Sequence, residues 1–181
     1  MVRWNARVNL TAIRDPEEIV GRHFGESLFL ARHLFAAGSG PNIQVLDIGS
    51  GAGFPGLPLK IWNLAISLTL VESNQKKAAF LREVIRALVL TDVKVIAARA
   101  ETLIDSQPKS DVVTFRAVEC FEAVLPTAAS LVAASGRLAL LIGSAQLPAL
   151  ASIEPKLRWM PPIPVPQSQS RVLSISIPQV G

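Results

Sequence analysis

The sequence predicts an α/β domain built on a doubly wound, mostly parallel sheet. Short, continuously apolar strand patterns alternate with helical patterns along the chain, and a glycine-rich turn follows the first of these strands. Continuously apolar strands are typical of parallel sheets covered by helices on both faces. With 181 residues, the chain has the length of one domain. Domains of this class bind their ligands beyond the carboxyl ends of the strands.

The first predicted element is a helix from Pro16 to about Phe35. Asp15 is a capping residue, and Pro16 fits a first helical turn. The acids of that turn suit the helix dipole. The segment 38–41, Gly-Ser-Gly-Pro, would end the helix. Its expected apolar positions include Ile19, Phe24, Leu28 and Leu34.

The remaining elements follow in alternation. Apolar runs predict strands at 45–48, 67–71, 93–97, 111–115, 138–142 and 172–177. The spacing of apolar residues predicts helices over 74–88 and 121–133, and Ser135-Gly136-Arg137 is interpreted as a turn. The proline-rich segment 161–166 predicts an extended connector or lid. No helix separates it from the last strand, which indicates an antiparallel edge.

Composition excludes several classes of protein. Half of the residues are hydrophobic, 18% are charged and the mean hydropathy is +0.39, which excludes a disordered chain. A single cysteine, Cys120, excludes an internal disulfide framework and fits a reducing compartment. No segment resembles a signal peptide, and the apolar run 124–142 is interrupted by Pro126 and Arg137. We therefore expect a cytoplasmic protein without a membrane span.

The positive charge is concentrated in the first half of the chain. The net charge is +4, and residues 1–99 carry 12 basic and 8 acidic side chains, whereas residues 100–181 carry 6 of each. A polyanion would therefore meet the first half of the chain, although an ordinary solvated surface explains a charge of this size equally well.

The glycine-rich turn is the most informative segment. It follows the strand 45–48 and contains Gly49, Gly51 and Gly53. Glycines there let backbone amides approach a ligand closely. Glu72 ends the next strand, where a carboxylate would accept both hydroxyls of a ribose. Strand, turn and acid together predict a nucleotide-binding site.

The pattern alone leaves two classes of nucleotide open. Residues 51–56 match the dinucleotide fingerprint G-x-G-x-x-G, which suggests a nicotinamide-dependent dehydrogenase. Asp47 opposes this interpretation, because a carboxylate there would repel a pyrophosphate but suit an ammonium or sulfonium group. Pro55 also removes a backbone donor from the place where a phosphate would bind. S-adenosylmethionine is the better fit.

Several ordered motifs resemble those of one family. Residues 4–16 resemble the signature W-N-x-x-x-N-L-T-x-I-R-D-P, and residues 22–27 resemble R-H-x-x-D-S with glutamate at position 26. The glycine turn with its F-P-G-L-P tail, Arg99-Ala100-Glu101 and Phe115-Arg116-Ala117-Val118 add three more. The sequence is thus similar to the guanine-N7 methyltransferases of bacterial small-subunit ribosomal RNA, also called the glucose-inhibited division protein B family.

The resemblance implies a class I S-adenosylmethionine-dependent methyltransferase, Rossmann-like in fold, acting on N7 of a guanine in 16S ribosomal RNA, free or in the small-subunit particle. It implies one methyltransferase domain over residues 1–181, with a helical segment at 1–40 and a Rossmann-like core at 41–181. The cofactor would be bound by Asp47 near the methionine ammonium, Gly49 and Phe54 along the cavity, Glu72 at the ribose, Ala100 and Glu101 at the adenine, and Arg116 at the junction with the substrate.

The predicted chemistry asks little of the protein. Guanine N7 already presents a lone pair, so positioning can suffice and no general base is needed. Arg116 is the candidate catalytic residue, because arginine pairs bidentately with O6 or with a phosphate; a structural ion pair, for example with Glu119, is the alternative. Arg7, Arg14, Arg22 and His23 are candidate RNA contacts. We expect no metal site, because the two histidines lack partners at ligand spacing.

Two departures from the family pattern leave a second function open. The fifth strand usually ends in Lys-Gly, but here Ile142 precedes Gly143, so an expected substrate contact is absent. The chain also begins almost at the Trp-Asn signature, so we expect the family's preceding helix to be missing. A module that binds cofactor or RNA with weak or no activity is the alternative function. We expect a monomer.

Overall fold

A computed structural model describes residues 1–35, 42–116, 121–154 and 156–177. Its helical elements are α1 (Val2–Val8), α2 (Pro16–Ile19), the π-helical η1 (Val20–Gly25), α3 (Glu26–Leu34), α4 (Gly56–Trp62), α5 (Gln75–Ala87), the 3₁₀ segments η2 (Ala100–Leu103) and η3 (Ser144–Gln146), α6 (Phe121–Ser130) and α7 (Leu147–Ile153). Its strands are β1 (Gln44–Ile48), β2 (Ser67–Val71), β3 (Val93–Ile96), β4 (Ser110–Arg116), β5 (Val132–Gly143), β6 (Arg158–Trp159), β7 (Ile163–Pro164) and β8 (Arg171–Ile177).

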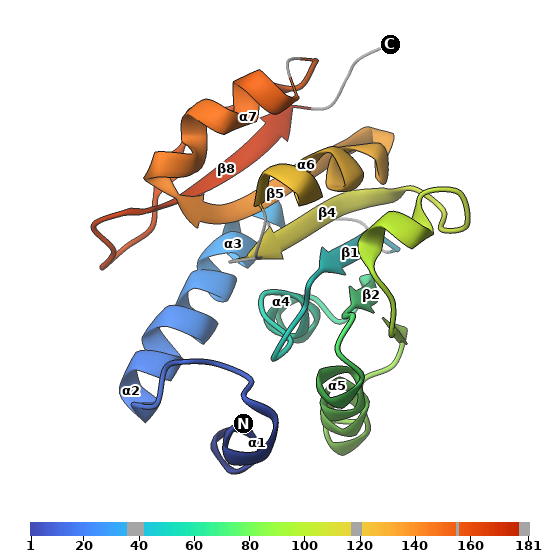
Figure 1. The fold of residues 1–181 in the computed structure, drawn as a ribbon, viewed down its shortest axis with the longest axis vertical. Helices are drawn as coiled ribbons and strands as arrows, with labels where there is room; N and C mark the ends of the chain where they lie inside the picture. Colours follow the sequence, from blue (N-terminus) through green and yellow to red (C-terminus); the bar gives the residue numbers. More distant parts are fainter. Residues whose placement is uncertain (36–41, 117–120, 155, 178–181) are drawn as a thin grey trace.

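The described strands form one mixed sheet in the order β3-β2-β1-β4-β5-β8-β6, with β7 also paired to β8 (Figure 1). Strands β1 to β5 run parallel to one another. Strand β8 runs antiparallel to β5 and also pairs antiparallel with β6 and β7. The order reverses between β1 and β4, and ligands of doubly wound folds bind at such a switch point. The predicted fold class and its antiparallel edge are confirmed.

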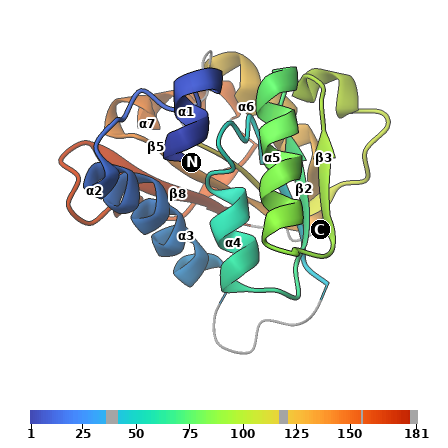
Figure 2. The ribbon, with the colours of Figure 1, turned by 90° about the horizontal axis from the view of Figure 1, so that it is seen from below.

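Helices cover both faces of the sheet, and each face has its own apolar core. On one face, α3, α4 and α5 pack on the sheet through residues such as Leu30, Leu59 and Leu81, all fully buried (Figure 2). On the other face, α6 and α7 contribute Leu125 and Leu150 to a second buried cluster. Burial on both faces explains why the central strands are continuously apolar.

The long N-terminal helix forms where the sequence predicts it, as the continuous run of α2, η1 and α3. The Asp15 carboxylate caps it by accepting the backbone N–H of Glu18 at 2.9 Å. Ile19 is buried as expected, but Phe24 and Leu28 are 39% and 37% exposed. Phe24 and Leu28 come five and nine positions after Ile19, so a helical period of 3.6 residues places them away from the buried face.

Most other boundaries agree with the sequence, and one interpretation is wrong. Strand β2 coincides with its prediction, and Asn74 caps α5 by accepting the N–H groups of Lys76 and Lys77. Ser135-Gly136-Arg137, expected as a turn, lies within β5. The β4–β5 register shifts there, and a Cβ at Gly136 would come within 2.8 Å of the carbonyl oxygens of Ser110 and Asp111. The glycine therefore permits a close strand approach at an irregularity rather than a chain reversal.

The proline-rich segment is extended, as predicted, and adds to the sheet edge. Ile163 and Pro164 pair with Leu173 and Val172 of β8. Proline is tolerated there because an edge strand needs donors on one side only.

Some sequence interpretations fall outside the described residues. They concern the helix-ending segment 38–41, the motif positions 117–118, the ion-pair candidate Glu119, and Cys120. None of the helices in the described part is long and apolar enough to span a membrane.

Candidate active site

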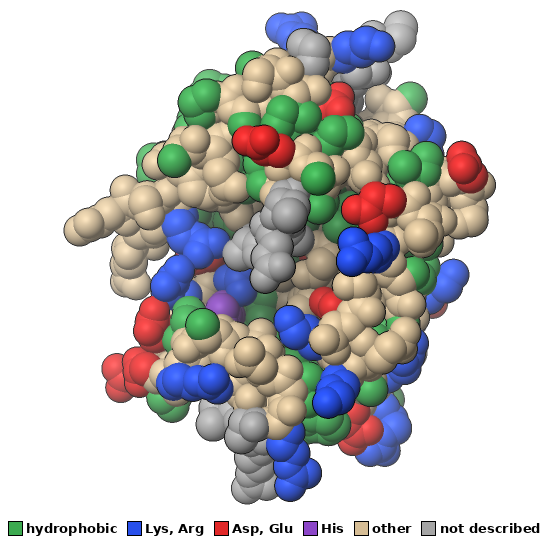
Figure 3. Space-filling model, in the orientation of Figure 1, with side chains coloured by type: hydrophobic (Ala, Val, Ile, Leu, Met, Phe, Trp, Pro, Cys, Tyr) green, Lys and Arg blue, Asp and Glu red, His purple; other side chains and the backbone are tan. Residues whose placement is uncertain are grey.

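A cavity of about 730 Å³ opens at the carboxyl ends of the central strands. This volume is typical of sites that hold a nucleotide-sized ligand. Figure 3 shows basic side chains gathered around a histidine in a recess on this side of the molecule. The cavity brings together eight residues predicted from the sequence: Gly49, Gly51, Phe54, Glu72, Ala100, Glu101, Arg116 and His23.

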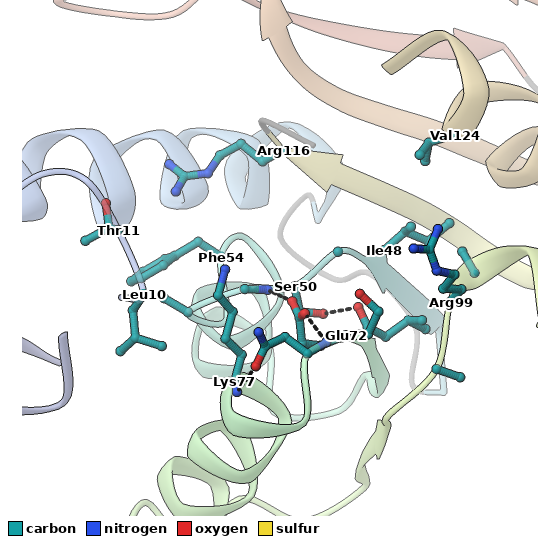
Figure 4. A pocket seen from close by; sticks show the side chains of 18 of the residues that line it. Leu10, Thr11, Ile48, Ser50, Phe54, Glu72, Lys77, Arg99, Arg116 and Val124 are labelled. Atoms are coloured by element: carbon teal, nitrogen blue, oxygen red, sulfur yellow. Dashed lines mark hydrogen bonds between the residues drawn. The ribbon is translucent and has the colours of Figure 1, made fainter. Parts of the chain in front are cut away.

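Glu72 fixes one wall of this cavity. Its carboxylate accepts the backbone N–H of Gly51 at 2.8 Å through one oxygen and that of Asn74 at 2.7 Å through the other (Figure 4). The glutamate therefore ties the end of β2 to the glycine turn that follows β1. Each carboxylate oxygen keeps a further lone pair, so the group can still accept a hydroxyl donated by a ligand.

The glycine turn does not form a phosphate cradle. The N–H groups of Gly53 and Phe54 donate to the Ser50 carbonyl, and that of Leu57 donates to the Gly53 carbonyl. The first amide of α4, at Gly56, donates to the Asp47 carboxylate at 3.1 Å. Amides that would cradle a pyrophosphate at a helix N-terminus are thus used inside the turn. This geometry disfavours a dinucleotide.

Asp47 and Gly53 lie behind the cavity wall. Asp47 is fully buried beneath the turn, and its Oδ1 has no hydrogen-bond partner among the described residues. Burial raises the pKa of this carboxyl to about 7, against the smaller lowering effect of the hydrogen bond from Gly56. A Cβ on Gly53 would come within 2.3 Å of Leu57, so this glycine serves the packing of the turn on α4.

The segment after β3 forms a third side of the cavity. Ala98, Arg99, Ala100 and Glu101 line it, with Ala100 buried and Glu101 exposed at the start of η2. This wall stands beyond Glu72 as seen from Arg116 (Figure 4). The positions expected to meet an adenine are therefore at the opposite end of the cavity from Arg116.

Arg116 occupies the other end and is held by several partners. Its guanidinium donates to the Arg22 carbonyl at 2.8 Å, to the Glu26 carboxylate at 3.4 Å and to Nδ1 of His23. It also lies 5.5 Å from the centre of the Phe54 ring, on which His23 stacks. Its side chain is only 9% exposed. The guanidinium is therefore fixed at the edge of the cavity.

Two of these neighbours were not predicted as site residues. Glu26, 4% exposed, pairs with Arg116 and lies 3.4 Å from Nε of Arg171 on β8. Two guanidinium groups thus share one carboxylate, which leaves a net positive charge in a largely buried place. The alternative that Arg116 forms an ion pair is partly correct, but the described partner is Glu26. Position 26 belongs to the R-H-x-x-D-S resemblance, which was the available signal.

Leu10 and Thr11 also line the cavity, although neither was predicted as a site residue. They follow α1, which lies against α5 (Figure 2). The ring centres of Trp4 and Phe80 are 5.5 Å apart, with the ring planes tilted by 60°. The W-N-x-x-x-N-L-T resemblance covers these positions, so the signal was present without a structural interpretation.

The remaining RNA candidates are not among the residues that line the cavity. Arg7, Arg14 and Arg22 are exposed; Arg14 donates to Asn9, and Arg22 forms a 3.1 Å ion pair with Glu18. On α5, Arg86 pairs with Glu83 and Arg82 is exposed, as expected of a solvated face, but Lys77 lines the cavity.

Ile142 is buried in an apolar cluster and is only 3% exposed. A lysine at this position would start among Leu125, Leu150 and Val172 rather than in the cavity. Gly143, the next residue, pairs across the sheet with Arg171. Arg171 therefore supplies a positive charge beside the end of β5, although position 142 itself is apolar.

No group of three His, Cys, Asp or Glu side chains in the described ranges is arranged to hold a metal ion.

The comparisons with known proteins decide the family. The family model for rRNA small subunit methyltransferase G matches residues 1–158. The chain belongs to this family. The resemblance stated from the motifs is confirmed.

Curated relatives in this family share substantial identity with the chain. The ribosomal RNA small subunit methyltransferase G of Roseiflexus sp. (strain RS-1) is 57% identical over 118 residues, which are 64% of this chain and 49% of the relative. The proteins of the same name from Chloroflexus aggregans and Xylella fastidiosa are 45% and 39% identical, over 76% and 86% of this chain and 58% and 70% of the relatives. The chain thus spans about half of the first of these relatives.

Solved structures of methyltransferases share the fold. The magnesium protoporphyrin IX methyltransferase of Synechocystis PCC 6803, solved with bound SAM, aligns with a TM-score of 0.76 over 97% of this chain and 89% of that chain, at 15% identity. A SAM-dependent methyltransferase from Aquifex aeolicus aligns with a TM-score of 0.69 over 93% and 96%, at 14% identity. The fold is therefore that of class I SAM-dependent methyltransferases.

Proposed function

We propose that this chain is a methyltransferase that uses S-adenosylmethionine to methylate N7 of a guanine in 16S ribosomal RNA. One observation carries the proposal: a single cavity places the glycine turn and Glu72 at one wall and the fixed guanidinium of Arg116 at the other. Membership in the rRNA small subunit methyltransferase G family supports the substrate class.

The residues present fit this cofactor. Glu72 would accept the ribose hydroxyls, and the wall at Ala100 and Glu101 would contact the adenine. When ionised, the buried Asp47, with one oxygen unpartnered among the described residues, gives negative potential beneath the turn, which suits a cationic methionine end. The backbone N–H groups of the turn are already hydrogen-bonded within it, which favours a ligand without phosphate over a dinucleotide.

The reaction needs orientation rather than proton transfer. When bound, the cofactor supplies a methyl carbon made electrophilic by its sulfonium. The N7 lone pair forms the new N–C bond, while the C–S bond breaks and sulfur takes the electron pair, so no proton moves at N7. Both ring nitrogens of His23 are already hydrogen-bonded in the described structure. His23 is thus unsuited to act as a base, and the chemistry requires none.

Arg116 would orient the target guanine. Its position at the end of β4, with most of its donors facing fixed partners, allows a remaining N–H to meet O6 or a phosphate of the substrate. The neighbouring Arg171 adds positive charge at the same end. Exposed Arg7, Arg14 and Arg22 would extend this charge toward the RNA.

The substrate would be 16S ribosomal RNA, free or in the small-subunit particle, which also implies a cytoplasmic site of action. The monomeric state and the single domain over residues 1–181 stay predictions.

The test is methyl transfer from labelled S-adenosylmethionine to 16S ribosomal RNA and to small-subunit particles from a strain lacking the corresponding gene. We expect one labelled guanine, with chain cleavage after N7-specific chemistry at that nucleotide. Label at another base atom would contradict the guanine-N7 assignment. Cofactor binding without transfer to either substrate would favour the alternative of a binding module.

A further inference from the structure

A chain of hydrogen bonds links the N-terminal segment to Arg116. Asn5, on α1 and 5% exposed, donates through Nδ2 to the Thr11 carbonyl at 3.1 Å and accepts the Thr11 N–H at 2.9 Å through Oδ1. This reciprocal pair fixes the backbone of Thr11 at the cavity wall. The Thr11 hydroxyl in turn lies 2.9 Å from Nε2 of His23.

The protonation of His23 follows from its two partners. A guanidinium can only donate, so Nδ1, which meets Arg116, must carry a lone pair. In a neutral imidazole the proton is then on Nε2, which donates to the Thr11 hydroxyl oxygen. Stacking on Phe54 at 5.0 Å between ring centres holds the ring plane. The ring therefore transmits the position of Thr11 to Arg116.

The surrounding charges keep this imidazole neutral. Burial and the guanidinium groups of Arg116, Arg22 and Arg171 lower the pKa of His23 to about 4. Glu26, one helical turn further along, is the acid that faces this group, and it is paired with Arg116 and Arg171. A protonated imidazole would be repelled by the three arginines, and it would lose the Nδ1 lone pair that accepts the hydrogen bond from Arg116.

We propose that Thr11, anchored by Asn5, is a positioning residue for Arg116 that acts by accepting the Nε2–H of His23 and so holding the Nδ1 lone pair toward the guanidinium. The N-terminal segment is thereby part of the substrate end of the cavity. This inference rests on the proposed function for its effect on rate, whereas the tautomer itself can be measured without activity.

The rate experiment uses isosteric variants at Thr11. Thr11→Val removes the hydroxyl and keeps the shape, whereas Thr11→Ser keeps the hydroxyl. We expect Thr11→Val to lower the single-turnover rate of methyl transfer about tenfold, with S-adenosylhomocysteine affinity within about twofold of the wild type. Thr11→Ser should retain most of the rate. Thr91→Val, at an exposed threonine remote from the cavity, is the matched control and should leave rate and affinity unchanged.

A double-mutant cycle tests the route through Arg116. In an Arg116→Lys background, Thr11→Val should cause little further loss, because the residue it positions is gone. A full additional tenfold loss would overturn the proposal, as would a wild-type rate for Thr11→Val itself. An equal fall in rate and cofactor affinity would show a merely structural wall and would overturn it as well.

The second measurement is independent of activity. The chain has two histidines, so ¹⁵N labelling of histidine gives two imidazoles to assign. His23 should appear as the Nε2–H tautomer and should not titrate between pH 5 and 8, whereas the exposed His33, whose Nδ1 lies 2.8 Å from the Phe29 carbonyl, is the internal control. In Thr11→Val the Nε2–H of His23 loses its acceptor, so the ¹⁵N signal of Nε2 should shift while the signals of His33 stay unchanged.

A His23 that is protonated on Nδ1, or an Nε2 signal unaltered by Thr11→Val, would overturn the inference. If the wild type transferred no methyl group to RNA but showed the expected tautomer and the shift of its Nε2 signal in Thr11→Val, the proposed function would fail while the positioning chain stood.

Discussion

The two ends of the cavity are built differently. At the glycine turn, the Glu72 carboxylate accepts hydrogen bonds from the backbone N–H groups of Gly51 and Asn74, which follow β1 and β2. At the opposite end, Arg116 is held by side chains and a carbonyl that come from the N-terminal helix, while Glu26 also meets β8. The Glu72 end is thus held by hydrogen bonds to the backbone of nearby turns, and the Arg116 end by contacts between residues far apart in the sequence.

This difference implies a division of labour. A change at the Glu72 end should weaken cofactor binding, because it alters the backbone that surrounds the ligand. A change at the Arg116 end should slow methyl transfer and leave cofactor binding nearly intact, because it alters only the groups that face the substrate. Each prediction below tests one side of that division.

The largest effect is expected at Glu72. Glu72→Gln puts an amide where a carboxylate accepts two backbone N–H groups, so one of them loses its acceptor. The affinity for S-adenosylhomocysteine should fall about 100-fold, roughly 2.7 kcal/mol, as measured by calorimetry. Glu83→Gln, an exposed glutamate on α5, is the control and should bind normally. Normal binding by Glu72→Gln would remove this end from the cofactor site.

Arg116→Lys should separate rate from binding. Lysine keeps the charge but cannot reproduce the fork that meets His23, Glu26 and the Arg22 carbonyl. The single-turnover rate should fall about 30- to 100-fold, roughly 2–2.7 kcal/mol in the barrier, with cofactor affinity within about threefold. Arg82→Lys on the exposed face of α5 should change neither. A parallel loss of affinity would show that the two ends are not separable.

Ile142→Lys should destabilise the fold rather than restore a substrate contact. The new ammonium would be placed in an apolar cluster at a position that is 3% exposed. The free energy of unfolding should fall by about 2 kcal/mol, measured by urea denaturation. Ile61→Lys, at a half-exposed position on α4, should cost much less. A stable Ile142→Lys variant with a faster rate would instead support a degenerate substrate end.

The last prediction concerns the pH dependence of stability rather than an affinity or a rate. The pKa of Asp47 is raised to about 7, so the folded chain binds a proton there that the unfolded chain releases above about pH 4. This contribution to stability therefore grows as pH falls from 7 to 4. His23, with its pKa lowered to about 4, has the opposite effect between pH 6.5 and 4, because there the unfolded chain binds the extra proton.

Asp47→Asn should show that the effects of Asp47 and His23 on the pH dependence of stability oppose each other. The variant keeps only the His23 contribution, so its stability should decline from pH 6.5 to 4 relative to the wild type, by up to about 1.4 kcal/mol per pH unit. Denaturant titrations of both proteins across this range measure the difference. A difference that is independent of pH would show that Asp47 is ionised throughout.

The residues at the glycine-turn end of the cavity could be predicted from the sequence, whereas most partners of Arg116 at the other end could not. The strand, the glycine turn and Glu72 are close in sequence, and their roles follow from backbone chemistry that a motif encodes. The partners of Arg116 lie 90 or more positions away, so no periodicity or spacing connects them. Asn5 and Thr11 belong to a motif, but only the fold shows that Asn5 holds the backbone of Thr11 and that Thr11 meets His23.

Two interpretations show where a sequence pattern misleads. Phe24 and Leu28 are apolar, but they lie five and nine positions after Ile19 and so off the face that a helical period of 3.6 residues buries. Gly136 was assigned to a turn, whereas it allows β5 to approach β4 closely, and glycine in a strand and glycine in a turn look alike in sequence.

The most direct test of the central claim is calorimetric titration of the chain with S-adenosylhomocysteine and, separately, with NADH. We predict saturable binding of S-adenosylhomocysteine at one site per chain and no saturable binding of NADH. Saturation by NADH, with no heat from S-adenosylhomocysteine at high concentration, would contradict the account of the cavity.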